Sequence, residues 1–307
     1  MRAVAILGPN ATIEDVRRFY TANAHPEPVS PGNPLAGADA ALIFGGDGTV
    51  HDHLPEFIVH QVPMLPVPLG SGNDFHRALG FGTMAAALAA WRGFCSGAER
   101  SRRIDLGMIS RLEGDAPKFV SYFCCVGGVG LDSEANRRAN AMPRWLRANG
   151  GYIAAVIGAV AAFKPQKITV ECGVGQPPSA GLMEGQAGAP VSRRISEPAM
   201  FVAFGNAQSY GGGMRITPTA RLEDGLLDVC FVRQVGKARL LRLFPTVFSG
   251  KHVGIKEVEY FQAERVRVET ETTLDVYADG EFICQTPVEV TVAPRAMRVI
   301  LPPLAKR

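Results

Sequence analysis

Residues 41–49 read Ala-Leu-Ile-Phe-Gly-Gly-Asp-Gly-Thr, an apolar run that changes abruptly into glycines around a carboxylate. Its apolar first half predicts a buried strand, and the glycines after it mark a strand end where the backbone approaches another group. Glycines expose consecutive backbone N–H groups, which can bind a phosphate together with the Thr49 hydroxyl and the start of a following helix. A tight turn between a strand and a helix, with no ligand, is the alternative.

A second loop of this kind follows the strand predicted at Met64 to Pro68. It reads Leu-Gly-Ser-Gly-Asn-Asp-Phe over residues 69–75, with small residues and a hydroxyl where a strand meets a helix. Neighbouring parallel strands end at the same edge of a sheet, where open α/β sheets bind nucleotides. Two such loops therefore favour nucleotide binding over two unrelated turns.

Length and composition describe a globular chain. Its 307 residues fit one large or two ordinary domains, and 47% apolar residues can form a sizeable core. A net charge of +3 is too small to predict nucleic-acid binding, although it is compatible with an anionic ligand or surface. The six cysteines do not have metal-site spacing, and Cys124-Cys125 lies in an apolar run, so we expect core thiols in a reducing compartment.

Neither an export signal nor a membrane anchor is predicted. The first residues, Met1 to Leu7, have the pattern of a strand and not of a signal peptide. The longest apolar stretch, Tyr152 to Phe163, is far shorter than the ~20 residues that a membrane-spanning helix needs. We therefore expect a cytoplasmic protein.

The order of predicted elements divides the chain in two. Strands at Met1–Leu7, Ala38–Phe44 and Met64–Pro68 alternate with helices at Thr12–Tyr20, His51–Val59 and Thr83–Phe94. Further strands are predicted at Phe119–Val126, Lys167–Cys172, Met200–Asn206, Leu226–Arg233, Val266–Glu269, Leu274–Tyr277 and Val288–Val292, with a helical insert at Arg137–Phe163 and a loop at Gly173–Pro190. This pattern predicts a Rossmann-like α/β domain over residues 1–104 and a β-sandwich domain over residues 105–307, whose last strand can return to the first domain.

Six motifs occur in order between Ala41 and Pro303. They are GGDGTV (Gly45 to Val50), PLGSGNDFHRALG (Pro68 to Gly80), RRIDLG (Arg102 to Gly107), GGVGLDSE (Gly127 to Glu134), YGGGMRITPTARLEDGLLDV (Tyr210 to Val229) and ADGE (Ala278 to Glu281). In this order they resemble the diacylglycerol kinase catalytic-domain family, which includes sphingosine and ceramide kinases and bacterial soluble lipid kinases. NAD kinases and phosphofructokinases share the first motif, so it is the six motifs in order that carry the resemblance.

The resemblance implies an ATP- and Mg²⁺-dependent lipid kinase with its active site in the cleft between the two domains. Such an enzyme, acting in phospholipid metabolism, transfers a γ-phosphoryl group to a hydroxyl of diacylglycerol, a sphingoid base or a related lipid. The residues expected to bind the nucleotide are Gly45, Gly46, Asp47, Gly48 and Thr49 in the first loop and Ser71, Gly72 and Asn73 in the second. Asp47 has two interpretations, a water-mediated contact with nucleotide-bound Mg²⁺ or a carboxylate that stabilises the turn.

Asp279 and Glu281 are the predicted catalytic pair. By its residues alone, Asp279-Gly280 indicates a hairpin turn. The resemblance implies instead that Asp279 accepts the proton of the lipid hydroxyl, while Glu281 orients the nucleophile or a metal. Mutual repulsion can raise the pKa of one of two nearby carboxyl groups.

A second metal site is implied at the loop from Arg221 to Asp228. In the family this loop holds a structural Mg²⁺; here Asp224 and the Leu226 carbonyl fit, whereas Arg221 can offer only its carbonyl. Either that carbonyl serves or the cation is absent. By contrast, the spacing of His51, His53 and His60 fits no four-ligand metal site.

Two basic clusters bear on partners. Arg100 to Arg103 form one, and Arg137, Arg138, Arg144 and Arg147 beside Trp145 form the other. Such clusters are commonly solvated faces, but the second can also dock on an anionic bilayer. The expected partner is a lipid substrate at the inner membrane surface, through peripheral contact and without nucleic acid; a homodimer remains an open alternative.

Two rival functions differ in sequence. An NAD-kinase-like phosphotransferase should carry an Asn-Glu pair downstream of GGDGT, and the chain has none. A catalytically inactive lipid- or nucleotide-binding relative is the other rival, and Asp279 together with both glycine loops argues against it.

Overall fold

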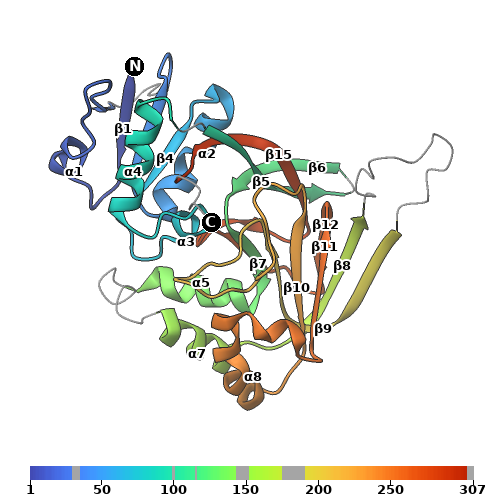
Figure 1. Ribbon diagram of the computed structural model, residues 1–307. Coiled ribbons are helices and arrows are strands. Elements are labelled where there is room, and N and C mark those ends of the chain that lie inside the picture. The colour runs from blue at the N-terminus through green and yellow to red at the C-terminus, as the bar shows by residue number, and fades with distance from the viewer. Residues whose placement is uncertain (30–34, 99–100, 115, 143–151, 175–190, 303–307) are drawn as a thin grey trace.

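The computed structural model describes residues 1–29, 35–98, 101–114, 116–142, 152–174 and 191–302 (Figure 1). The first half contains β1 (Ala3–Leu7), α1 (Ile13–Arg17), β2 (Glu27–Pro28), β3 (Ala40–Gly45), α2 (Asp47–His60), β4 (Met64–Pro68), α3 (Asp74–Ala78) and α4 (Met84–Cys95). The second half contains β5 (Ser101–Glu113), β6 (Ala116–Phe123), β7 (Val126–Gly130), α5 (Leu131–Ala141), α7 (Tyr152–Ala162), β8 (Gln166–Val174), β9 (Val191–Gly205), β10 (Leu227–Arg233), α8 (Lys237–Leu243), the 3₁₀ helices η2 (Phe244–Ser249) and η3 (Lys251–Gly254), β11 (Val258–Ala263), β12 (Arg265–Thr270), β13 (Asp275–Ala278), β14 (Glu281–Gln285) and β15 (Val288–Ile300).

The first half is a parallel sheet in the order β4-β3-β1-β2, with helices packed around it. Every residue of β3 is buried, as expected for an uncharged apolar strand covered on both faces. The three principal strands lie where the sequence predicts them. Their parallel direction brings the carboxyl ends of β3 and β4, and therefore the two glycine loops, to one edge.

Helix α2 begins earlier than predicted. It starts at Asp47 rather than His51, so the GGDGT motif runs from the last residue of β3 into the first turn of α2, and the helix continues through Pro55. Gly46 is the N-cap and offers no side-chain hydrogen bond to the first turn. The backbone N–H groups at this helix start are thus left without a side-chain cap.

The second half is mainly antiparallel and forms a β-sandwich-like domain. Strands β8, β10, β12 and β13 lie where predicted, and β9 and β15 are longer than predicted. The strand predicted at Phe119 to Val126 is confirmed in part: residues 119–123 belong to β6, which ends at Phe123, and β7 begins at Val126. The ladder is interrupted at Cys124-Cys125 because the backbone N–H groups there bind a carboxylate, as described below.

Helices α5, α7 and α8 gather at one end of the second half (Figure 1). The predicted helical insert is partly confirmed by α5 and α7, whereas residues 143–151 lie outside the described part of the chain. Most of the loop predicted at Gly173 to Pro190 lies outside it too. None of the helices over the described residues has the length and apolar character needed to span a bilayer.

Strand β15 connects the two halves. It pairs antiparallel with β5 along most of its length and meets β4 in parallel at Val299 and Met64. The register of β15 against β5 shifts between Ala293 and Met297. One hydrogen-bonded sheet path therefore runs through both halves, and the predicted division after residue 104, which falls within β5, stays a prediction.

Candidate active site

The two glycine loops lie in direct backbone contact. The Leu69 N–H donates to the Gly45 carbonyl at 3.0 Å. A Cβ atom placed on Gly70 would lie 2.5 Å from Gly46 Cα, which is closer than side chains tolerate. Glycine is therefore required for the packing of one loop on the other, independently of any ligand.

Asn73 closes the second loop on itself. Its backbone has a φ of 55°, in the left-handed region. Its side-chain oxygen accepts from the Gly70 N–H at 3.0 Å, and its side-chain nitrogen donates to the Gly70 carbonyl at 2.7 Å. Both ends of the amide thus hold the loop, while Ser71 beside it is exposed.

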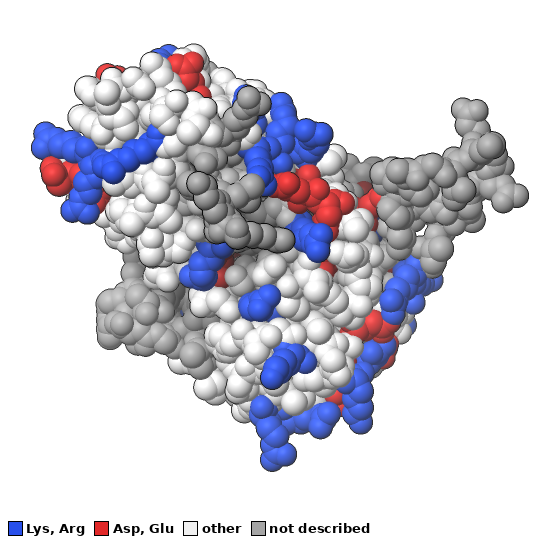
Figure 2. Space-filling view, viewed as in Figure 1, with Lys and Arg blue, Asp and Glu red and all other residues white. Residues whose placement is uncertain are grey.

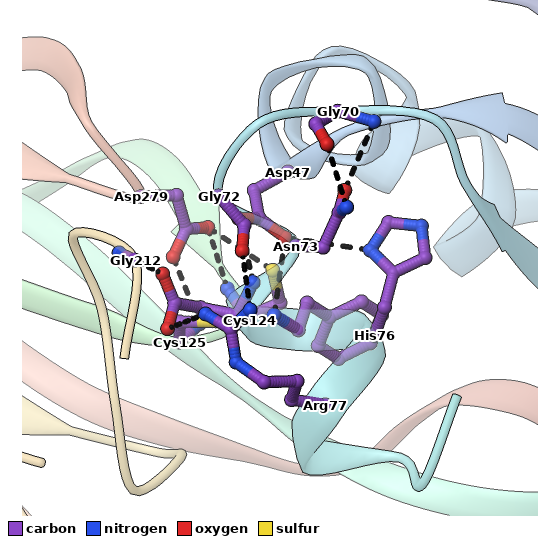
Figure 3. Close-up of polar contacts among 12 residues, drawn as sticks. Asp47, Gly70, Gly72, Asn73, His76, Arg77, Cys124, Cys125, Gly212 and Asp279 are labelled. Atoms are coloured by element: carbon purple, nitrogen blue, oxygen red, sulfur yellow. Dashed lines mark hydrogen bonds and ion pairs between the residues drawn. The ribbon is translucent and has the colours of Figure 1, made fainter. Parts of the chain in front are cut away.

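Asp47 joins the two loops (Figure 3). Its carboxylate accepts the backbone N–H of Asp74 at 2.8 Å and that of Phe75 at 3.0 Å, at the start of α3. His76 Nδ1 lies 3.5 Å from the same carboxylate. The turn-stabilising interpretation of Asp47 is therefore visible in the structure, and its contact with nucleotide-bound Mg²⁺ stays a prediction.

Asp74 ties the second loop to the other half of the chain. Its carboxylate accepts the backbone N–H groups of Gly212 at 2.7 Å and Gly213 at 2.9 Å, and Arg77 donates to it at 2.6 Å. Burial raises its pKa, against the hydrogen bond from Gly212. The YGGG motif is thereby placed against the nucleotide loops.

Asp279 lies at the turn between β13 and β14, with a φ of 53°. Its carboxylate accepts the backbone N–H groups of Cys124 and Cys125, each at 2.8 Å, and His51 Nδ1 lies 3.1 Å from it. The side chain has 0% exposure. Burial raises its pKa, but the hydrogen bond and charge of His51, with both backbone donors, lower it overall. A repulsion-raised pKa is therefore not found at Asp279.

Cys124 and Cys125 are more than core residues, because their backbone positions the Asp279 carboxylate. Their thiols and this carboxylate lie within 4.8 Å of one another, in the arrangement of possible metal ligands. Burial raises the pKa of the Cys124 thiol to about 12. A hydrogen bond with the Cys124 thiol, together with burial, raises the pKa of the Cys125 thiol. The Asp279 carboxylate already accepts two backbone N–H groups and contacts His51, so its oxygens are occupied and no metal is assigned to this cluster.

His51 is the residue that the sequence did not assign to the site. It lies on α2, one turn after Asp47, and 228 positions before Asp279 in the sequence. Burial lowers its pKa, but the hydrogen bond and charge of Asp279 raise it overall, with help from Glu281 and Asp52. The available signal was the i, i+4 spacing, which places Asp47 and His51 on one helix face.

Glu281 approaches the first glycine loop from the second half. A Cβ atom placed on Gly48 would lie 3.5 Å from Glu281 Oε1. The structure thus brings together Gly48, Asp279 and Glu281, which are distant in sequence. The roles predicted for the two carboxylates stay predictions.

The predicted structural-metal loop has two exposed carboxylates, Glu223 and Asp224, and Asp224 accepts the Leu226 N–H at 3.1 Å. The nearest alternatives are already bonded. Asp105 accepts the N–H groups of Gly225 and Arg295, and Asp228 accepts from Thr219, Tyr260 and Gln262. Since this donor set fits a Mg²⁺ site poorly, the site at Asp224, Leu226 and Arg221 stays a prediction, and no chemical step is assigned to it.

An apolar pocket lies between α5, α7, α8 and η2. Its apolar lining consists of Leu131, Ala135, Val156, Val160, Phe201, Met214, Ile216, Val232, Val235, Leu240, Leu241, Leu243, Phe244, Val247, Ile255 and Val258. Asp132 and Tyr210 are among its few polar lining residues and are hydrogen-bonded to each other. Burial raises the pKa of Asp132 to about 6, against the hydrogen bond from Tyr210.

The turn from Tyr210 to Met214 touches both the pocket and the nucleotide loops. It is closed by reciprocal backbone bonds between its end residues, at 3.1 and 3.0 Å. Tyr210 faces Asp132 in the pocket, whereas Gly212 and Gly213 bond to Asp74. This turn therefore connects the pocket with the second glycine loop.

Basic side chains gather over α8 (Figure 2). Lys237, Arg239, Arg242 and Lys251 are exposed there, with Leu241 40% and Phe248 43% exposed beside them. Of the predicted basic cluster, Arg137 and Arg138 pair with Glu134, and Arg144, Trp145 and Arg147 lie outside the described residues.

Both halves of the chain match known protein families. Residues 23–109 match the diacylglycerol kinase catalytic domain family, and residues 125–301 match the YegS C-terminal NAD kinase beta sandwich-like domain family. A diacylglycerol kinase of Mycobacterium tuberculosis (strain H37Rv) is 34% identical over 269 residues, covering 87% of this chain and 78% of the relative. A diacylglycerol kinase of Bacillus subtilis (strain 168) is 23% identical, covering 86% and 78%.

Solved structures show the same fold. A diacylglycerol kinase from Bacillus anthracis aligns with a TM-score of 0.65 at 16% identity, covering 98% of this chain and 97% of that one. Yeast NADH kinase in complex with NADH aligns with a TM-score of 0.52 at 9% identity, covering 100% and 84%. At these identities the likeness concerns the fold alone.

Proposed function

Because this chain belongs to the diacylglycerol kinase family of lipid kinases, we propose that it transfers the γ-phosphoryl group of MgATP to a hydroxyl of diacylglycerol or a related lipid. One observation carries the proposal. Two touching glycine loops lie at the ends of β3 and β4, and α2, which follows the first loop, is bonded through His51 to a buried carboxylate, Asp279, from the other half of the chain. Phosphoryl transfer needs this combination of phosphate binding, positioning and a proton acceptor.

The nucleotide side of the proposed site is the start of α2. Its first backbone N–H groups have no side-chain cap, and a helix start attracts anions. Gly45, Gly46, Gly48 and Thr49 would contact the phosphates there, with Ser71 and Gly72 opposite. Mg²⁺ carried in with ATP would neutralise charge on the phosphates, while Asp47 and Asn73 hold the two loops in place.

The acceptor side is the apolar pocket. Its lining suits an acyl chain, and its contact with the nucleotide loops runs through the turn that bears Tyr210 and Gly212. A lipid whose chain lies in the pocket would present its hydroxyl toward Asp279. A diacylglycerol-type lipid is proposed because two relatives similar to this chain in sequence carry the name diacylglycerol kinase.

We further propose that the surface over α8 contacts the membrane during catalysis. Arg242 and Lys251 can attract anionic headgroups, and Leu241 and Phe248 can enter the interface. The pocket is lined in part by α8 itself, so a lipid could pass from this surface to the pocket.

The decisive experiment offers the purified protein radiolabelled ATP and Mg²⁺ with diacylglycerol, sphingosine, ceramide or NAD, in zwitterionic or anionic vesicles. Label should appear in a lipid, faster on anionic vesicles, and this preference should weaken at high salt. Label in NAD alone would replace the proposal by an NAD-kinase-like activity. Label in no acceptor would overturn it, and equal rates on both vesicle types would overturn the membrane contact alone.

Replacing Val160 by Phe should narrow the acyl-chain pocket. Val160 lines it and is 2% exposed. Excluding about two methylenes removes about 1.6 kcal/mol of apolar burial, so kcat/KM for a long-chain lipid should fall about tenfold. The KM for ATP should not change. Ala161→Phe, at an exposed position of the same helix, is the control, and an equal loss in both variants would contradict the pocket assignment.

A further inference from the structure

His51 pairs with Asp279, whose side chain is fully buried. The Asp279 carboxylate accepts two backbone N–H groups and contacts His51 Nδ1, and the Cys124 thiol lies 3.3 Å from the same oxygen as His51. The oxygens of Asp279 are therefore surrounded by donors. A lipid hydroxyl would have to displace one of them to deliver its proton to this carboxylate.

The ring of His51 remains accessible. Its side chain is 11% exposed, and Nδ1 is the atom directed to Asp279. None of the described residues forms a hydrogen bond with Nε2. This nitrogen is also not one of the buried polar atoms without a partner, so it is exposed to solvent. Donation from Nδ1–H to the carboxylate fixes the tautomer in which Nε2 bears the lone pair.

The position of His51 fits proton transfer at the phosphate site. It lies one helical turn after Asp47, within the helix whose start faces the proposed phosphates. Its pairing with Asp279 brings that helix against the turn between β13 and β14. The imidazole therefore stands between the donor loops and the half that holds the lipid.

We propose that His51 Nε2 is the general base of the reaction and that Asp279 is its positioning residue. This inference rests on the proposed function. The lipid O–H bond breaks as its proton passes to Nε2, the lipid oxygen forms a bond to the γ-phosphorus, and the bond from that phosphorus to the leaving ADP oxygen breaks. The resulting imidazolium is paired with the Asp279 carboxylate and later releases its proton to water.

The charge around His51 sets the expected pH dependence. Three carboxylates face it, Asp279 and Glu281 from the second half and Asp52 from its own helix, and the Cys124 thiol stays protonated. Burial lowers the pKa of His51, but these carboxylates raise it overall. Neutral His51 is the base, so the rate should rise with pH through a pKa above the ordinary histidine value of about 6.5.

The test compares pH profiles of the wild type, His51→Asn and His53→Asn. His53 is the matched control, because it lies on the same helix and pairs with Glu56 at 3.3 Å, away from Asp279. Wild type and His53→Asn should show the same rising limb in kcat. In His51→Asn the rising limb should disappear, kcat should fall about 10²-fold, and the KM for ATP should not change. The loss of rate is moderate because a base contributes little to a loose transition state of phosphoryl transfer.

A ring-nitrogen NMR titration supplies a readout that does not depend on turnover. The His51 signal should show the Nδ1–H tautomer and a raised pKa in the wild type, and that pKa should fall in Asp279→Asn. The inference would be overturned if the wild type phosphorylates lipid and the rising limb of its pH profile persists in His51→Asn. It would also be overturned if Asp279→Asn leaves the pKa of His51 unchanged. In both cases the proposed function would stand. A wild type that phosphorylates no lipid would overturn both.

Discussion

Replacing Asp279 by Asn is expected to lower kcat for lipid phosphorylation about 10²-fold, as much as the loss of His51, while MgATP binding persists. Both carboxylate oxygens accept hydrogen bonds, from Cys124 N–H, Cys125 N–H and His51. The Asn amide carries an NH₂ group in place of one carboxylate oxygen. This donor must then face at least one of the three groups that bind the carboxylate, so that a hydrogen bond is lost. The variant therefore loses the orientation of His51 and the neutralising charge, whereas the glycine loops do not contact Asp279.

The same variant should also be less stable, by about 1–3 kcal/mol, because a buried donor loses its partner. Folding raises the pKa of His51 through its ion pair with Asp279. This ion pair stabilises the fold fully below the ordinary histidine pKa of about 6.5, and the stabilisation is lost as the pH rises through the raised pKa. Denaturant unfolding should then show a larger destabilisation at about pH 5.5 than at about pH 9.

Asp275→Asn is the control, since Asp275 lies on the same β13 strand and accepts only from the side chain of Gln285 at 2.9 Å among the described residues. It should keep wild-type kcat. Wild-type turnover in Asp279→Asn, measured with radiolabelled ATP and lipid, would remove Asp279 from the active site.

Gly70→Ala should disable the nucleotide site from a position that needs no contact with ATP. The new methyl group would lie 2.5 Å from Gly46 Cα and 2.8 Å from the Asn73 side-chain oxygen. The first of these neighbours is backbone, so the two loops must separate. A shift of about 1 Å at a phosphate site can cost about 10²-fold in rate, and the strain should cost about 1–3 kcal/mol of stability.

The measurements are the KM for ATP, kcat and the unfolding midpoint, alongside Gly82→Ala. A Cβ on Gly82 meets nothing within 4 Å, so this variant should resemble the wild type. If Gly70→Ala keeps both its stability and its KM for ATP, the close contact of the loops is not required for the site.

Local sequence was sufficient to predict the elements that present the nucleotide loops. The apolar run before Gly45 and the one before Gly70 became β3 and β4, because a continuous uncharged run of this length suits a strand buried on both faces. The start of α2 was placed too late because glycines at a helix start are indistinguishable by propensity from a loop. That error hid His51, which lies on the helix face of Asp47.

The pairings within the site could not be derived from short-range pattern. Asp47 bonds to the start of α3, Asp74 to the YGGG turn, and Asp279 to residues more than 150 positions away. Each contact depends on how the strands are ordered in the sheet, which periodicity does not encode. The resemblance to a family identified Asp279 as important, but it did not reveal which partners surround its carboxylate.

Strands β5 and β15 cross together from one half to the other, and this has a mechanical consequence. At the register shift in β15, Arg295 has a φ of 52° and its N–H is held by Asp105 of β5. The halves are thus joined by a paired ribbon with a fixed bend. Any change in the angle between the two halves must deform both strands at that bend. A motion that opens or closes the space between the halves would therefore be a stiff bending of this strand pair, in contrast to the unrestrained motion that a single-chain linker allows.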